Sequence, residues 1–244
     1  MKNLLKSLLV MCFTIGLFSS SYAQAPTADN TQTGVVAGGT YTYTIPTTTG
    51  ETPAWTVLDD SGAELVSGAG DFDLSSVSDF EKSITWNTQG TFYVKVITTD
   101  DATLCTNQYV IQVDVATNDY VVAFNTTATV SVYCADDANI ASGMEITLDV
   151  TLGGTTPDAT YYDMEVQYQI DSGSTELATI VSGSNAFNIP AITIADAVNP
   201  GFTSVTVTIL KVTDSKGVEF TPASGDENFV ITVNPIPAIP TITF

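Results

Sequence analysis

The amino-acid sequence predicts an all-β protein built from two β-sandwiches in tandem. Short stretches of alternating apolar and polar residues recur along the chain, separated by turns rich in Gly, Asp, Asn and Pro, a pattern typical of antiparallel sandwiches. Hydrophobic residues make up 44% of the 244 residues, which excludes a disordered chain. The exception to this pattern is residues 194–198, which predict one helical turn at most.

Residues 1–23 are predicted to be a secretory signal peptide. Lys2 and Lys6 give it a basic start, residues 8–18 are apolar, and residues 21–23 (Ser-Tyr-Ala) offer a cleavage site. The apolar run is too short to span a membrane, and no later stretch is apolar enough to cross a bilayer. We therefore expect an exported protein, at the outer cell surface or outside the cell, or in the periplasm.

The charge of the chain limits the classes of partner. With six Lys, no His and 27 acidic residues the formal charge is −21, and loss of the two signal-peptide lysines makes it −23. Phosphate contacts are made chiefly by Lys and Arg, so we exclude nucleic acid as a partner. Histidine is the commonest general base and transition-metal ligand, so its absence argues against an enzyme.

Residues 24–33 are polar and lack periodicity, which predicts a flexible leader. Residues 34–116 predict the first sandwich, with strands at 40–45, 54–58, 63–67, 83–86, 91–98 and 108–115.

The segment from Ile84 to Val96 is the clearest fold marker. It predicts a hairpin of two strands joined by a polar turn that ends at Gly90. Successive side chains of a strand point to opposite faces, so we expect Trp86 and Phe92 in the core.

A polar break at residues 116–120 predicts the boundary to a second sandwich, residues 117–233. Its predicted strands are at 120–124, 128–133, 145–152, 164–170, 177–181, 191–194, 204–212 and 228–233, and residues 214–217 (Asp-Ser-Lys-Gly) predict a turn. Residues 234–244 form a Pro-rich tail that we expect to be extended, because proline fixes the backbone and removes donors. An extended segment can add to an exposed sheet edge, so we hypothesise that Ile242 and Phe244 dock on a partner.

Several motifs together resemble a known family. They are Gly39-Thr-Tyr-Thr-Tyr, Ala54-Trp-Thr-Val, Gly90-Thr-Phe-Tyr-Val-Lys-Val and Tyr109-Val-Ile-Gln-Val-Asp-Val in the first half, with Val132-Tyr-Cys and Val212-Thr-Asp-Ser-Lys-Gly in the second. The chain resembles the PKD-like, immunoglobulin-like repeats of secreted and cell-surface proteins in Bacteroidota. The resemblance implies spacers, adhesins or assembly modules, with cell-surface or secretion-system proteins as partners. The second half resembles a companion repeat of the same proteins and departs from it at Val218, where that repeat often carries a Cys.

Cys105 and Cys134 are the only cysteines after signal cleavage, and an exported pair is a disulfide candidate. If residues 108–115 and 120–133 form one hairpin, the two cysteines face each other. If the domains stack end to end, the cysteines lie far apart and stay free. The sequence leaves both arrangements open.

Acidic pairs occur in the predicted turns, and oxygen-rich loops can bind Ca²⁺. The candidate ligands are Asp100 and Asp101 with Asp136 and Asp137, because these pairs flank the cysteines near the predicted junction. The sequence contains no complete calcium-loop motif, and turn residues are normally polar and exposed, so we favour a role in solubility.

Two further motifs have competing interpretations. The Asp-Ser-Gly sequences that begin at Asp60 and Asp171 are found in aspartic proteases, yet they are also what a β-turn requires, and we favour turns. Aromatic residues suggest a sugar-stacking platform, for which Tyr93, Tyr161 and Tyr162 are the more exposed candidates, whereas the tryptophans are expected in the core.

We therefore expect a non-enzymatic, exported structural or adhesive protein of the cell surface, acting through protein–protein assembly that includes self-assembly. The alternative is a carbohydrate-binding module that uses Tyr161 and Tyr162 on a glycan. No cofactor is expected beyond the candidate Ca²⁺.

Overall fold

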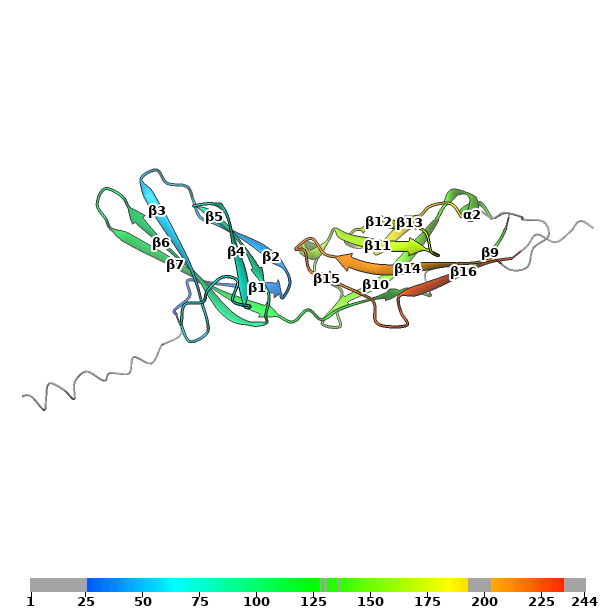
Figure 1. The fold of residues 1–244 in the computed structure, drawn as a ribbon, viewed down its shortest axis with the longest axis horizontal. Coiled ribbons are helices and arrows are strands. Elements are labelled where there is room, and N and C mark those ends of the chain that lie inside the picture. The colour runs from blue at the N-terminus through cyan, green and yellow to red at the C-terminus, as the bar shows by residue number, and fades with distance from the viewer. Residues whose placement is uncertain (1–25, 128, 130, 136, 193–202, 235–244) are drawn as a thin grey trace, which may run out of the picture.

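The computed structural model describes residues 26–127, 129, 131–135, 137–192 and 203–234. The expected signal peptide, the helical turn at 194–198, Asp136, and the tail residues Ile242 and Phe244 lie outside the described residues. Figure 1 shows two β-sandwiches following one another along the long axis of the molecule.

The first sandwich consists of two facing sheets. One sheet has the strand order β1-β7-β6-β3, with β1 (Asn30–Val36), β7 (Thr106–Ala116), β6 (Gly90–Asp100) and β3 (Glu51–Leu58). The other has the order β2-β5-β4, with β2 (Thr40–Thr44), β5 (Glu81–Trp86) and β4 (Phe72–Ser78).

The core of the first sandwich forms around Trp86, as expected. Its side chain is fully buried, and its ring stacks on that of Phe92 with centroids 4.9 Å apart. The indole Nε1 donates a hydrogen bond to the Tyr43 hydroxyl at 3.2 Å. The buried indole N–H of Trp86 therefore has a hydrogen-bond partner.

The predicted hairpin between Ile84 and Val96 is wrong in its pairing, although both strands exist. β5 pairs with β2 and β4, whereas β6 pairs with β3 and β7. Residues 87–89 therefore cross from one sheet to the other. Trp86 and Phe92 meet between the sheets because each faces inward from its own sheet.

Three further expectations for the first half are corrected. Residues 30–32 of the expected leader pair in parallel with β7 and belong to β1. The expected strand at 63–67 is reduced to an isolated bridge between Glu64 and Leu58. Strand β4 was not expected, because most of its residues are polar and exposed at a sheet edge, with Phe72 alone fully buried.

The second sandwich also has two sheets. One has the order β13-β10-β8, with β13 (Ala186–Ile189), β10 (Met144–Leu152) and β8 (Tyr120–Phe124). The other follows β12-β11-β14-β16-β9, with β12 (Thr175–Ile180), β11 (Met164–Ile170), β14 (Thr203–Thr213), β16 (Asn228–Asn234) and β9 (Val132–Cys134), and β15 (Glu219–Phe220) pairs with β14.

The predicted strands of the second half agree with the structure except at three segments. The strand expected at 128–133 is reduced to β9 at 132–134 among the described residues. At 191–194, residues 191 and 192 are not in a strand and residues 193 and 194 lie outside the described residues, whereas β13 forms at 186–189, where Phe187 and Ile189 alternate inward. A short helix, α2 (Ala138–Ser142), was not expected. None of the helices in the described part of the chain is long and apolar enough to span a bilayer.

Candidate functional site

The strand β1 ends between the two cores. Val35 is fully buried in the core of the first sandwich, and Val36, which is 1% exposed, belongs to the core of the second. Adjacent residues of a strand point in opposite directions, so one strand supplies a side chain to each core. The two sandwiches therefore share apolar packing across the junction.

The turn after β1 is held to the first sandwich by backbone hydrogen bonds. Ala37 N donates to the Ala116 carbonyl at 2.9 Å, and Gly38 N donates to the Trp86 carbonyl at 2.6 Å. Trp86 N in turn donates to the Gly39 carbonyl at 3.0 Å. The turn is thus fixed at three points before it meets the second sandwich.

Gly39 is required by close packing at this turn. A Cβ at this position would lie 2.8 Å from the Tyr41 ring and 3.0 Å from a methyl group of Val218 in the second sandwich. Real Cβ atoms are essentially never found within 3.0 Å of other heavy atoms, so a larger residue would have to displace the Tyr41 ring and would press on Val218 of the second sandwich.

Two hydrogen bonds join the sandwiches directly. Thr40 N donates to the Lys216 carbonyl at 2.7 Å. The Tyr161 hydroxyl donates to the Gly34 carbonyl. Buried polar groups without partners are costly, so both bonds favour one relative orientation of the sandwiches.

A buried carboxylate holds the loop that carries Lys216. Asp214 is 5% exposed. Its Oδ1 accepts from Lys216 N at 2.8 Å and Val218 N at 2.9 Å, and its Oδ2 accepts from the Tyr120 hydroxyl at 2.9 Å. The predicted turn at residues 214–217 is therefore confirmed, and it is anchored to the second sandwich on both sides.

The tyrosines around this carboxylate stay protonated. Burial raises the pKa of Tyr41 to about 12. Burial, followed by the negative charge of Asp214, also raises the pKa of Tyr120 and that of Tyr161. The phenols therefore remain hydrogen-bond donors at physiological pH.

The loops of the second sandwich at the junction are also tied to each other. Ser215 N donates to the Tyr161 carbonyl at 3.0 Å, and its hydroxyl donates to the Thr160 carbonyl at 2.8 Å. In the connecting segment, the Asn118 side chain donates to the Glu219 carbonyl at 3.1 Å. The polar break predicted at residues 116–120 is therefore a short connection held by hydrogen bonds.

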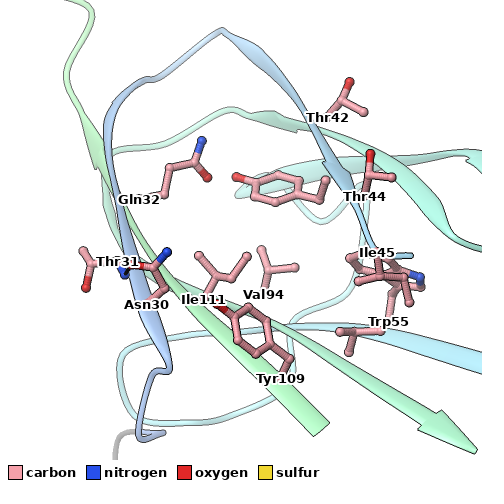
Figure 2. Close-up of a pocket in the computed structure, with 12 residues that line it drawn as sticks. Asn30, Thr31, Gln32, Thr42, Thr44, Ile45, Trp55, Val94, Tyr109 and Ile111 are labelled. Carbon is pink, nitrogen blue, oxygen red and sulfur yellow. Dashed lines mark hydrogen bonds between the residues drawn. The ribbon is translucent and has the colours of Figure 1, made fainter. Parts of the chain in front are cut away.

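The first sandwich carries an open groove (Figure 2). It lies between the edge strand β2 and the residues of β1, β3, β6 and β7 that face it, and its volume is about 410 Å³. Figure 2 shows Tyr109 and Ile111 on one side and Thr42 and Thr44 on the other, with Trp55 at the end near Ile45. None of the residues lining it is charged.

Both cysteines are free and exposed. Cys105 lies in the β6–β7 loop of the first sandwich, and Cys134 ends β9 at the far end of the second (Figure 1). β7 pairs with β1 and β6, whereas β8 pairs with β10, so the long hairpin that would bring the cysteines together does not exist. The end-to-end alternative is the correct one.

Asp100, Asp101 and Asp137 do not lie at the junction, so the expectation is wrong for these three residues, while Asp136 lies outside the described residues. Asp100 lies at the tip of the β6–β7 hairpin, where the Thr103 hydroxyl and N–H lower the pKa of its carboxyl group. The Asp101 carboxylate accepts from the Thr52 hydroxyl at 2.8 Å, and Asp137 follows β9 in the second sandwich. No cluster of three or more potential ligands is found among the described residues. Calcium binding stays a prediction.

The tyrosines proposed as a sugar platform are not exposed as expected. Tyr161 is 6% exposed, and Tyr93 is 7% exposed in a small cluster with Leu58. Tyr162 is half-buried, and its hydroxyl donates to the Asn185 side chain at 2.9 Å. Tyr161 is buried because it packs edge-on against the Tyr120 ring and reaches the neighbouring sandwich.

The two Asp-Ser-Gly sequences lie in turns. Asp59 closes the first by accepting from the Ser61 hydroxyl at 2.7 Å and from Ala63 N at 2.8 Å. The Asp171 carboxylate accepts from Thr206 N at 2.8 Å. The turn that contains Asp60 lies in the first sandwich, and the turn that contains Asp171 lies in the second. The Asp59 carboxylate accepts hydrogen bonds within its own turn, and the Asp171 carboxylate accepts one from the neighbouring strand β14.

Sequence reasoning missed the residues that build the junction. In the sequence, Val36 cannot be told from an ordinary strand residue. The burial of Asp214 depends on Tyr120, which is 94 positions away in the chain. The Gly38-Gly39 pair just before an alternating strand was the one local sign of a close approach.

No family model and no curated protein matches this sequence. Solved structures that resemble it contain fibronectin III-like and Ig-like domains. One is the fibronectin(III)-like modules of Clostridium thermocellum CbhA, with 12% identity, 87% of this chain and 92% of that chain covered, and a TM-score of 0.37. Another is a chimeric titin Z1Z2, with 14% identity, coverage of 89% and 99%, and a TM-score of 0.40. At such values the likeness carries no argument about function, and the sandwich architecture rests on the strand pairing.

Proposed function

We propose that the protein is a non-enzymatic, exported structural or adhesive element of the cell surface that acts through protein–protein assembly. Its structural units are residues 34–116 and 117–233, of the PKD-like kind found in Bacteroidota. Its partners are cell-surface or secretion-system proteins or further copies of the chain. The protein acts by geometry, holding its outer surfaces at a fixed spacing.

The junction is the observation that carries this proposal. Val36 packs in the core of the second sandwich, and the Thr40 and Tyr161 hydrogen bonds cross the same interface. A flexible linker would allow the sandwiches to reorient, as is the default for domains in one chain. A shared core instead favours a stiff rod, which suits a spacer or an assembly unit.

Rigidity is tested on the chain from Gln24 by small-angle X-ray scattering and by residual dipolar couplings. We expect one elongated conformation and a single alignment tensor for both sandwiches. Gly39→Val should produce two independent tensors, because its side chain would meet Tyr41 and Val218. Independent tensors in the parent chain would contradict the proposal.

Export is tested separately on intact cells. A surface protein is digested by added protease and labelled by an antibody without permeabilisation, whereas a cytoplasmic control protein is neither. Protection of the protein in intact cells, with digestion after lysis, would contradict a surface location.

A further inference from the structure

The first sandwich leaves part of a sheet edge unpaired. β6 and β7 each have 11 residues, whereas β2 in the facing sheet has five. β1 pairs with β7 only from Ile111 onward, and Asp29 extends the edge bonding to Val110. No described strand pairs with this edge of β7 at residues 106–109.

The groove lies next to this unpaired edge. Val94, Val96 and Ile111 line it together with Trp55, and Tyr109 is 44% exposed in its wall. β2 borders the opposite side, and it too is an edge strand. An extended segment placed here would gain main-chain hydrogen bonds from β7 and apolar contacts from the groove, as in strand addition to a sheet edge.

The chain itself contains a segment with matching properties. Residues 235–244 have no charged side chain in a protein of net charge −21, and the residues lining the groove are also uncharged. Proline has no N–H to donate, so pairing is restricted to residues 241–244, after the last proline. Ile242 and Phe244 are two positions apart and share one face of an extended strand, which would place both in the groove.

A chain cannot fill its own groove. The segment starts after Asn234, and β16 pairs beside the start of β14, at the end of the second sandwich away from the junction. The 11 residues of β14 span about 36 Å toward the junction. Ten extended residues reach about 36 Å at most, so they are used up before the first sandwich begins.

We propose that the groove of one copy binds residues 241–244 of a second copy, adding a short strand to β7. This inference rests on the proposed assembly function and names its partner. Because the donor and acceptor surfaces differ, each copy can donate and accept at once. Such contacts form open head-to-tail chains unless the rotation closes a ring.

The test uses sedimentation velocity on the chain from Gln24 over a micromolar to millimolar range. We expect the parent to associate with rising concentration. A variant lacking residues 235–244 should stay monomeric, and Tyr109→Glu should weaken association by at least about tenfold, because it places a charge in an uncharged groove. Tyr109 is exposed, so this change should leave the fold intact, which circular dichroism verifies.

Complementation distinguishes binding in the groove from non-specific association. The truncated variant keeps its groove, and Tyr109→Glu keeps its segment, so mixing the two should give 1:1 dimers only. Leu177→Glu is the matched control, since Leu177 is 61% exposed in the second sandwich, and it should associate like the parent. A monomeric parent, a monomeric mixture, or loss of association in Leu177→Glu would each overturn the proposal while leaving rigidity and surface location untouched.

The cysteines report the direction of docking. Cys134 in β9 lies opposite Asn234 in β16, the residue just before the segment. Cys105 lies two residues before Asn107, at the open end of β7. A segment that enters from this end leaves Cys134 of the donor within about 25 Å of the open end of β7, because seven residue steps separate Asn234 from Thr241. A bifunctional maleimide with a spacer of that length should then link parent chains into a ladder that Cys105→Ser abolishes. Associated chains that fail to cross-link would overturn this direction.

Discussion

Val36→Ala tests whether the two sandwiches share a core. The change removes two methyl groups from a side chain that is 1% exposed. At about 0.8 kcal/mol for each buried carbon, with a further cost for the cavity, the expected loss is about 2 kcal/mol. The loss should fall on the second sandwich and on the junction, although Val36 belongs to a strand of the first.

Val35→Ala is the matched control, since Val35 is the adjacent residue and is fully buried in the first core. Both tryptophans of the chain, Trp55 and Trp86, lie in the first sandwich. Denaturant unfolding followed by tryptophan fluorescence therefore reports the first sandwich alone, and hydrogen exchange followed by mass spectrometry reports the second. We expect Val35→Ala to shift the fluorescence midpoint strongly.

Val36→Ala should leave that midpoint nearly unchanged and should speed exchange in β10 and β14 of the second sandwich. Identical effects of the two variants on tryptophan fluorescence, with unaltered exchange in the second sandwich, would refute the shared core. Additive effects in the double variant would further support separate sites of action.

Further outcomes follow from the same junction. Gly39→Ala should lower the free energy of unfolding by about 1–3 kcal/mol in urea melts, because its Cβ would meet the Tyr41 ring and Val218; a neutral result would show that the ring moves aside freely. Asp214→Ala should cost about 2–4 kcal/mol, since it leaves two N–H groups and a hydroxyl without their acceptor, whereas the exposed Asp226→Ala should cost almost nothing. Stability should fall as the pH rises above about 10, because an unfolded phenol loses its proton there while the folded protein holds the pKa of Tyr41 at about 12. The folded state then binds more protons than the unfolded state, and Tyr41→Phe should show a shallower decline of the urea midpoint; an equal slope in both proteins would assign the effect to other tyrosines.

The sequence predicted most strands because their side chains alternate with a period of two. That period reports which side chains share a face, and it correctly placed Trp86 and Phe92 in a core. It does not report which strand pairs with which, so β5 and β6 appeared to be a hairpin although they belong to opposite sheets. Sheet membership is decided by contacts between distant parts of the chain.

The junction between the sandwiches could not be predicted from the sequence for the same reason. Tyr161 was expected among the more exposed tyrosines, but its hydroxyl donates a hydrogen bond to the carbonyl of Gly34, which lies 127 positions earlier. The turn at residues 214–217 was predicted from its local composition, and its buried carboxylate was not. Local chemistry predicts turns, whereas burial depends on the partner that folding brings.

The placement of Val36 also limits how the two sandwiches can be exchanged during evolution. The residue is encoded with the first sandwich, yet its side chain belongs to the second core, in the same cluster as Val218 and Tyr161. If recombination joined the first sandwich to a new neighbour, Val36 would be exposed. If it joined the second sandwich to a new neighbour, the core of the second sandwich would contain a cavity where Val36 had packed. Insertion of one residue between Gly34 and Val35 would reverse the direction of both valines at once. We therefore expect the two sandwiches to be exchanged as a pair, despite their modular appearance.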